Sequence, residues 1–142
     1  MTDPGVDTPP RGASQPELPC AHGSPPVRGR LRATPEDFRV DEVLGFEADG
    51  VGAHALRTVE KRGANTGWVA AQLARAAGVA VRDVGWSGQK DRDALTRQAY
   101  TIPWPAQVPL ESCLEFAGEG FRGVDAARHG RKLRPGSHRA NR

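Results

Sequence analysis

The chain has few cysteines and no long apolar run. Only two of its 142 residues are cysteine, Cys20 and Cys113, and neither belongs to a Cys-x-x-Cys pair. We therefore expect no disulfide framework and no metal site, and a reducing, cytoplasmic compartment. No stretch approaches the roughly 20 apolar residues of a membrane span. The N-terminus also lacks the basic-then-apolar layout of a signal peptide, so we expect no membrane partner.

Several catalytic signatures are absent as well. The sequence contains no phosphate-binding P-loop, no glycine-rich dinucleotide fingerprint, no Gly-x-Ser-x-Gly elbow and no zinc-deaminase motif. These absences argue against ATPases, dehydrogenases and serine hydrolases.

Composition predicts one domain preceded by a leader. Seven of the 12 prolines fall in residues 1–27, which contain almost no large apolar side chains. Such a segment cannot bury enough surface to offset the entropy of ordering it, so we predict that it is disordered. Residues 28–142 are long enough for one modest core. The net charge of +3 is a mild bias towards polyanionic partners.

Periodicity predicts strands on both sides of one helix. Residues 38–43 alternate apolar and charged side chains, and residues 53–61 form a second strand candidate in which Leu56 and Val59 face opposite ways. We expect these two strands to pair as an antiparallel hairpin. A helix should follow, capped by Asn65 or Thr66 and ended by Gly78, with its apolar side chains at helical spacing.

The second half of the chain predicts further strands. Residues 84–87, 95–102 and 123–128 read as strands, the last of the chain being 123–128, while residues 111–116 fit a helix or a strand equally well. The predicted fold class is α+β, with a mixed, mainly antiparallel sheet and packed helices. The segment Lys90-Asp91-Arg92 should lie in a loop at the end of a strand, a common position for catalytic groups.

The residues with possible chemistry each have an ordinary alternative. Asp91 between two cations fits either an active carboxylate or a solvated turn with a surface ion pair. Phe38 fits either the core or a platform on which a base stacks. The basic residues 129–142, which include Arg131, Lys132 and Arg134, suit contacts to a phosphate backbone but also a disordered, solubilising C-terminus.

Taken together, several stretches resemble the N-terminal part of the catalytic domain of a TruD-type tRNA pseudouridine synthase. The match runs from about residue 28 to the end, and its pieces are individually weak but specific as an ordered set. They are Pro35-Glu36-Asp37-Phe38-x-Val40, Gly45-Phe46-Glu47 with Asp49-Gly50 and His54, Lys61 with Gly63 and Asn65-Thr66, Gly88-Gln89-Lys90-Asp91-Arg92 with Ala94, Thr96 and Gln98, and Ala127-Arg128-His129 with Arg131-Lys132-Leu133-Arg134 and Asn141.

This resemblance implies an enzyme that converts uridine to pseudouridine in tRNA, at position 13. Asp91 would be the nucleophile, with Lys90 and Arg92 favouring its charged form. Phe38 and Asn141 would bind the uridine. Lys90 and Arg32 are further substrate-binding candidates, and Arg32 stands where a lysine is expected.

The resemblance implies neither a metal nor an organic cofactor, and a complete enzyme that is monomeric. Family members continue well beyond the matched part, so we expect residues 28–142 to be the N-terminal portion of the catalytic domain. A non-catalytic RNA-binding remnant, or a fragment of such an enzyme, is the alternative.

Overall fold

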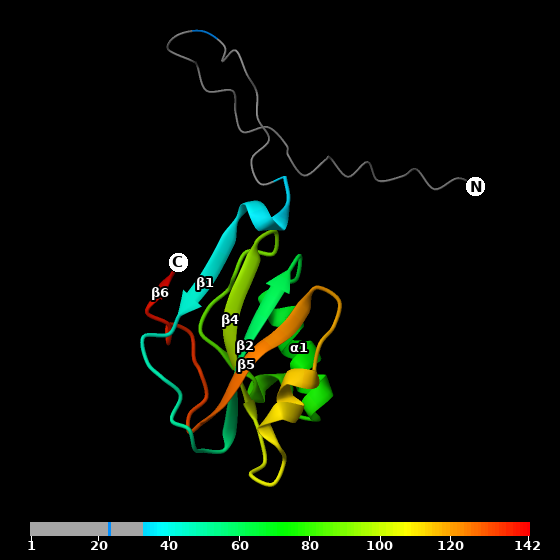
Figure 1. Ribbon diagram of the computed structural model, residues 1–142, viewed down its shortest axis with the longest axis vertical. Helices are drawn as coiled ribbons and strands as arrows, with labels where there is room; N and C mark the ends of the chain where they lie inside the picture. Colours follow the sequence, from blue (N-terminus) through cyan, green and yellow to red (C-terminus); the bar gives the residue numbers. More distant parts are fainter. Residues whose placement is uncertain (1–22, 24–32) are drawn as a thin grey trace, which may run out of the picture. The chain divides into compact units, whose positions relative to one another are not determined.

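A mixed sheet occupies the centre of the fold. The computed structural model describes residues 23 and 33–142, and in this part of the chain six strands form one sheet (Figure 1). They are β1 (Arg39–Val43), β2 (His54–Arg62), β3 (Gly85–Trp86), β4 (Leu95–Pro103), β5 (Phe121–His129) and β6 (Ala140–Asn141). The chain divides into two units, Met1–Arg30 and Leu31–Arg142, and all six strands lie in the second.

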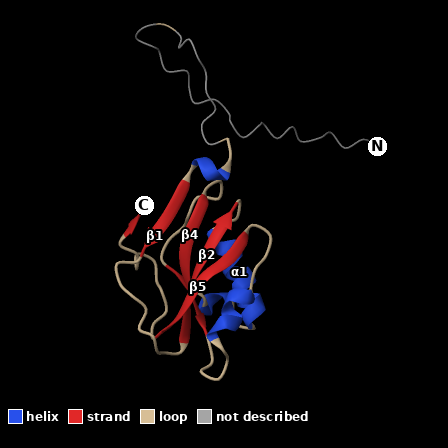
Figure 2. Ribbon diagram, in the orientation of Figure 1, coloured by secondary structure: helices blue, strands red, loops and turns tan. Residues whose placement is uncertain are grey.

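The strand order is β5-β2-β4-β1-β6, with β3 also paired to β4. The strands run side by side (Figure 2), and every pairing is antiparallel except the parallel pair of β1 and β4. The predicted hairpin between the first two strands is wrong, because β4 lies between β1 and β2. The ten residues 44–53 that join them exceed the usual hairpin loop, and the nine residues of β2 find full-length partners in β4 and β5.

The predicted helix is present as α1 (Thr66–Ala77). Asn65 precedes it with extended backbone angles, and Gly78 ends it in the left-handed conformation at φ +70°. Val69 and Leu73 are fully buried, although Ala76 is exposed. None of the described helices combines the length and apolar character needed to cross a membrane. The segment 111–116 that was ambiguous in the sequence is largely a 3-10 helix, Leu110–Glu115.

Each face of the sheet has its own apolar cluster, because alternate residues of β2 and β4 point in opposite directions. Ala55 and Val59 pack with the buried face of α1 in the larger cluster. Leu56 packs with Ala99 and Leu133 in the smaller one. The expectation that Leu56 and Val59 face opposite ways is confirmed.

The C-terminal basic segment is folded, so the alternative of a disordered, solubilising C-terminus is wrong. Leu133 is only 3% exposed, and its backbone N–H donates to Thr101 Oγ1 at 3.0 Å. Gly85 permits this close approach, since a Cβ there would lie 2.4 Å from the Leu133 carbonyl oxygen. The segment then adds β6 beside β1, so the strand predicted at 123–128 is not the last.

Candidate active site

The loop between β3 and β4, residues 87–94, carries Asp91 and is held by buried polar groups. Lys61, near the end of β2, donates from Nζ to the carbonyl oxygens of Ala64 (2.9 Å) and Asp91 (3.3 Å). The backbone N–H of Lys90 donates to Thr66 Oγ1 at 3.0 Å. Because these contacts reach the backbone on both sides of the Lys90–Asp91 peptide bond, they fix the position from which the Asp91 side chain leaves the chain.

The Asp91 residue itself is exposed. Its Oδ1 accepts the backbone N–H of Asp93 at 2.9 Å, the pattern of an Asx turn, and this contact orients the carboxylate. The geometry is that of an oriented carboxylate on a supported loop, which suits nucleophilic or general-base chemistry.

Lys61 is the cation whose ionisation responds to Asp91. Its side chain is buried, and burial lowers the pKa of its ammonium to about 8, with the negative charge of Asp91 opposing that shift and Lys90 adding to it. The sequence drew attention to Lys61 only as part of the family pattern. The sequence pattern that could have identified Lys61 as buried is its position two residues after Val59, which places both side chains on the core-facing side of the strand.

Lys90 has a different partner from the one expected. Its Nζ lies 2.9 Å from Oε2 of Glu42, and both side chains are at most 3% exposed. Glu42 also accepts the Ser87 hydroxyl at 3.0 Å and the Ala99 N–H at 3.2 Å. Ser87 Oγ in turn lies 2.9 Å from His138 Nδ1. Lys90 therefore anchors the loop to Glu42 of β1. The contact between Ser87 and His138 joins the loop to the C-terminal segment.

Arg92, the other predicted cationic neighbour of Asp91, donates from Nε to the Gly63 carbonyl oxygen at 3.4 Å. This hydrogen bond holds the loop to the turn after β2.

Phe38 and Asn141 are placed around the same part of the sheet. Phe38 is half-buried just before β1, and its carbonyl oxygen accepts the N–H of Leu95 at 3.0 Å. Asn141 is exposed on β6 and lies opposite Glu42, the partner of Lys90. The structure thus brings the segments of Phe38, Asp91 and Asn141 to neighbouring strands. Arg32 lies outside the described residues.

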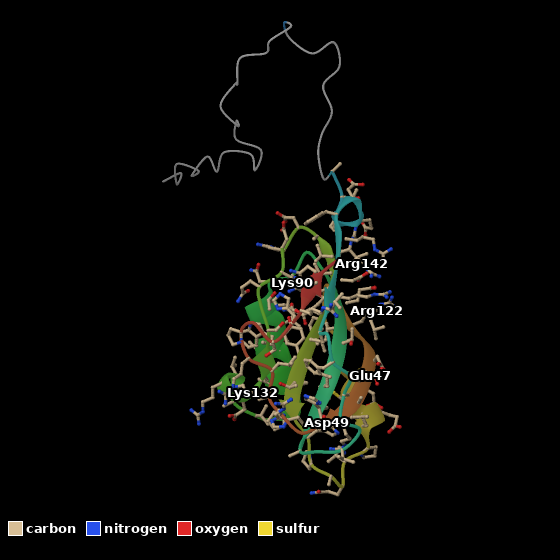
Figure 3. All side chains as sticks on the ribbon, turned by 90° about the vertical axis from the view of Figure 1, so that its left-hand side faces the viewer. Glu47, Asp49, Lys90, Arg122, Lys132 and Arg142 are labelled. Carbon is tan, nitrogen blue, oxygen red and sulfur yellow. The ribbon has the colours of Figure 1, made fainter. Side chains whose placement is uncertain are left out.

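Arg131, Lys132 and Arg134 belong to the segment that runs from the far end of the sheet towards the Asp91 loop, and Lys132 and Arg134 line a pocket together with Gln89 of that loop. All three are exposed and follow β5, whose last residue, His129, pairs with the first residue of β2. Figure 3 shows the separation: Lys90 and Arg142 lie in the upper half of the ordered part, and Asp49 and Lys132 lie in the lower half. Among the described residues, no group of three or more His, Cys, Asp or Glu side chains is placed to hold a metal ion.

Comparisons with known proteins agree on one family. The model of the family described as tRNA pseudouridine synthase D (TruD) matches residues 19–142. The tRNA pseudouridine synthase D of Chromohalobacter salexigens is 48% identical over 128 residues, and that of Cellvibrio japonicus is 43% identical over 127. These matches cover 89% and 88% of this chain but only 37% and 38% of the two relatives. The chain therefore spans little more than a third of their length.

The fold has a counterpart among solved structures. The crystal structure of a Methanosarcina mazei protein assigned to tRNA pseudouridine synthase D superposes with a TM-score of 0.68 at 23% identity. The superposition covers 80% of this chain and 25% of that protein. It confirms the predicted α+β fold with a mixed sheet.

Proposed function

The chain belongs to the tRNA pseudouridine synthase D (TruD) family, and we propose that it supplies the nucleophile-bearing part of an enzyme that isomerises uridine in tRNA. The proposed target is the uridine at position 13. The observation that carries this proposal is the family match over residues 19–142, which includes the supported loop of Asp91.

The reaction moves one bond and needs no net redox change. The N1–C1′ bond of uridine breaks, a C5–C1′ bond forms, and the proton lost from C5 is balanced by one gained at N1. In the proposed mechanism the Asp91 carboxylate attacks C1′ or adds to C6 of the base, and it is released when the new bond is complete. Both routes run without a metal or organic cofactor.

The other predicted site residues have distinct proposed roles. Phe38 would hold the detached uracil by stacking, and Asn141 would hydrogen-bond it. Lys90 would act mainly through its buried pair with Glu42, which fixes the nucleophile loop. Arg32 stays a prediction for the substrate site, and the monomeric state of the complete enzyme also stays a prediction.

A second candidate is an RNA-binding segment without turnover. It is supported by the exposed cations after β5, Arg131, Lys132 and Arg134, which suit contacts to a phosphate backbone with or without turnover.

The test is a single-turnover assay for pseudouridine in a tRNA transcript. It uses the 142-residue chain and a chimera in which residues 19–142 replace the matching segment of the Chromohalobacter salexigens relative. We expect Asp91→Asn to reduce the rate by more than about a thousandfold, because the amide keeps the turn to Asp93 but is a poor nucleophile. Asp93→Asn is the matched control, since it removes a carboxylate two residues away, and it should leave the rate within a few-fold.

The outcomes separate the two candidates. An Asp91→Asn chimera that forms pseudouridine at the wild-type rate would refute the nucleophile assignment. A wild-type chimera that binds tRNA and forms no product would favour the second candidate.

A further inference from the structure

A basic pocket lies beside the end of the sheet where His54 pairs with His129, and its Ser137 side extends towards the Asp91 loop. Its volume is about 540 Å³, and it lies between the loop after β1 and the segment after β5. The lining residues are Phe46, His129, Arg131, Lys132, Leu133, Arg134 and Ser137. We propose that this pocket binds a second nucleotide of the tRNA, away from the target uridine, with its base stacked on Phe46 and its phosphate held by Arg131 and Arg134. The proposal rests on the proposed function, because it takes tRNA as the ligand.

Phe46 is built as a stacking platform. Its side chain is 39% exposed, although large apolar side chains are usually buried. One face of the ring stacks on His129, with centroids 5.5 Å apart and planes 20° from parallel. His129 is itself fixed, since it is 2% exposed and its Nδ1 accepts the Asp49 N–H at 3.2 Å. A supported, exposed aromatic ring is the group on which proteins stack unpaired bases.

The backbone around Phe46 is constrained to this position. Gly52 has φ +130°, and a Cβ there would lie 2.4 Å from the carbonyl oxygen of His129. The loop of residues 44–53 is therefore pressed against the end of β5, and the N–H of Gly50 donates to the Arg128 carbonyl oxygen at 2.9 Å. These contacts form the pocket wall before any ligand arrives.

The charge of the pocket suits a phosphate. Three of the seven lining residues are Arg or Lys, and none is acidic. Lys132 donates from Nζ to the Arg82 carbonyl oxygen, so its ammonium is partly used within the protein. The guanidinium groups of Arg131 and Arg134 form no ion pair within the described residues. Two cations next to an aromatic ring match the phosphate and base of one nucleotide.

The stacking face of Phe46 is far from Asp91, although the other side of the pocket approaches the Asp91 loop, where the Gly136 N–H donates to the Ser87 carbonyl oxygen at 2.7 Å. Phe46 stacks on His129, which pairs with His54, and Lys61, which contacts the Asp91 loop, stands seven residues from His54 on β2. At about 3.3 Å per residue the two places on β2 are roughly 23 Å apart. A base stacked on Phe46 would therefore not be the uridine that Asp91 attacks.

The proposal is tested by the affinity for a tRNA transcript that carries the target uridine, measured with the same proteins as in the activity assay. We expect Phe46→Ala to weaken binding by roughly tenfold and Phe46→Trp to retain it, with quenching of the added indole when the base stacks. Val124→Ala, an exposed apolar side chain on β5, is the matched control and should bind as the wild type does.

The phosphate contact is tested by salt dependence. Replacing both Arg131 and Arg134 by Ala should lower the slope of log affinity against log salt by about two. The control is Arg75→Ala, which removes one exposed cation from α1 and should change affinity and slope little. The control variants Val124→Ala and Arg75→Ala should also form pseudouridine at a rate within a few-fold of the wild type, because neither residue lines the pocket or the Asp91 loop.

Equal affinity of Phe46→Ala and Val124→Ala, together with an unchanged salt slope in the arginine variant, would overturn the proposal. A loss of thermal stability without a loss of affinity would also overturn it and would indicate that protein packs into the pocket. The failure of the proposed function is a separate result: it would appear as product formation by Asp91→Asn, or as a wild-type chimera that forms no product, whatever the affinities of the pocket variants.

Discussion

The buried ammonium of Lys61 should make the stability of the chain rise with pH in the alkaline range. Its pKa is about 8 in the folded state and 10.5 in the absence of burial. Below pH 8 both states carry the proton, and the folded state bears the full cost of the buried charge. Between pH 8 and 10.5 the unfolded state binds more protons, so the free energy of unfolding increases with pH. Above 10.5 the increase is complete.

The size of this effect follows from the difference between the two pKa values. At about 1.4 kcal/mol per pKa unit, the difference corresponds to roughly 3 kcal/mol. Because the Lys61 side chain is only 1% exposed, solvent screening reduces this figure little.

Comparison with Lys61→Met isolates the contribution of Lys61. The two proteins are unfolded with urea from pH 7 to 11, and the difference in their free energies of unfolding is plotted against pH. Methionine keeps the length of the side chain and does not titrate in this range. Other titrating groups, such as the buried Tyr100, whose pKa is raised chiefly by burial, occur in both proteins and largely cancel.

The loss of the Lys61 hydrogen bonds in the methionine variant shifts the difference in free energy of unfolding by the same amount at every pH, so it does not change how that difference varies with pH. We therefore expect the wild type to gain about 3 kcal/mol relative to Lys61→Met across the range. A difference that stays flat between pH 7 and 11 would refute the reasoning.

The same measurement tests the electrostatic contact with Asp91 without any enzymatic assay. The negative charge of Asp91 raises the pKa of Lys61 against the larger effect of burial. In Asp91→Asn the rise in stability should therefore begin at a lower pH. Asp93→Asn is the control, because Asp93 is not among the causes of the Lys61 shift. A midpoint that does not move in Asp91→Asn would show that the carboxylate lies too far from the ammonium to act on it.

Two further predictions concern stability and are measured by urea unfolding at neutral pH. Lys90→Ala should cost about 3–5 kcal/mol by leaving Glu42 buried without its counter-charge. Lys90→Met combined with Glu42→Leu should recover part of that loss, because it removes the unpaired charge but also the acceptor of the Ser87 hydroxyl and the Ala99 N–H; a double variant as unstable as Lys90→Ala would contradict this. Gly52→Ala should destabilise by more than about 2 kcal/mol, because of its positive φ and the contact with His129. Gly67→Ala, in α1 with open space around it, should stabilise by up to about 1 kcal/mol, and equal effects at the two glycines would rule out the steric explanation.

Local signals in the sequence predicted local structure well. The helix was predicted from Asn65 and Gly78, which stand at its two ends; Gly78 ends it as predicted, whereas the Asn65 side chain forms no capping hydrogen bond. The strands β2 and β4 were predicted within a residue or two because each alternates or is bounded by a breaker. The pairing of β1 with β4 could not be predicted in this way, because the partners Arg39 and Leu95 are far apart in the chain and no local pattern encodes their register.

In the candidate site, too, the features encoded locally were predicted and those that depend on distant residues were not. Asp91 was identified by a family pattern, and its loop position followed from the glycine before it. The partners that support the loop were not predicted, because a charged residue in a strand is ordinarily assigned to the solvent face. Glu42 and Lys61 are instead buried, and each is compensated by groups from other elements. The basic C-terminal segment, whose sequence is otherwise typical of a solvated tail, is held by the buried Leu133, by β6 and by the contact of His138 with Ser87.

The pairing of β2 with β4 connects the two proposed RNA-binding places through one continuous pair of strands. These strands pair without interruption from His54 to Arg62, whereas the irregularity in the sheet lies between β2 and β5, at Thr58 and Val59. The Asp91 loop is attached to one end of β2 through Lys61. The pocket wall is attached to the other end through the pairing of His54 with His129. A base stacked on Phe46 would therefore be separated from the Asp91 loop by a spacing that the length of β2 sets.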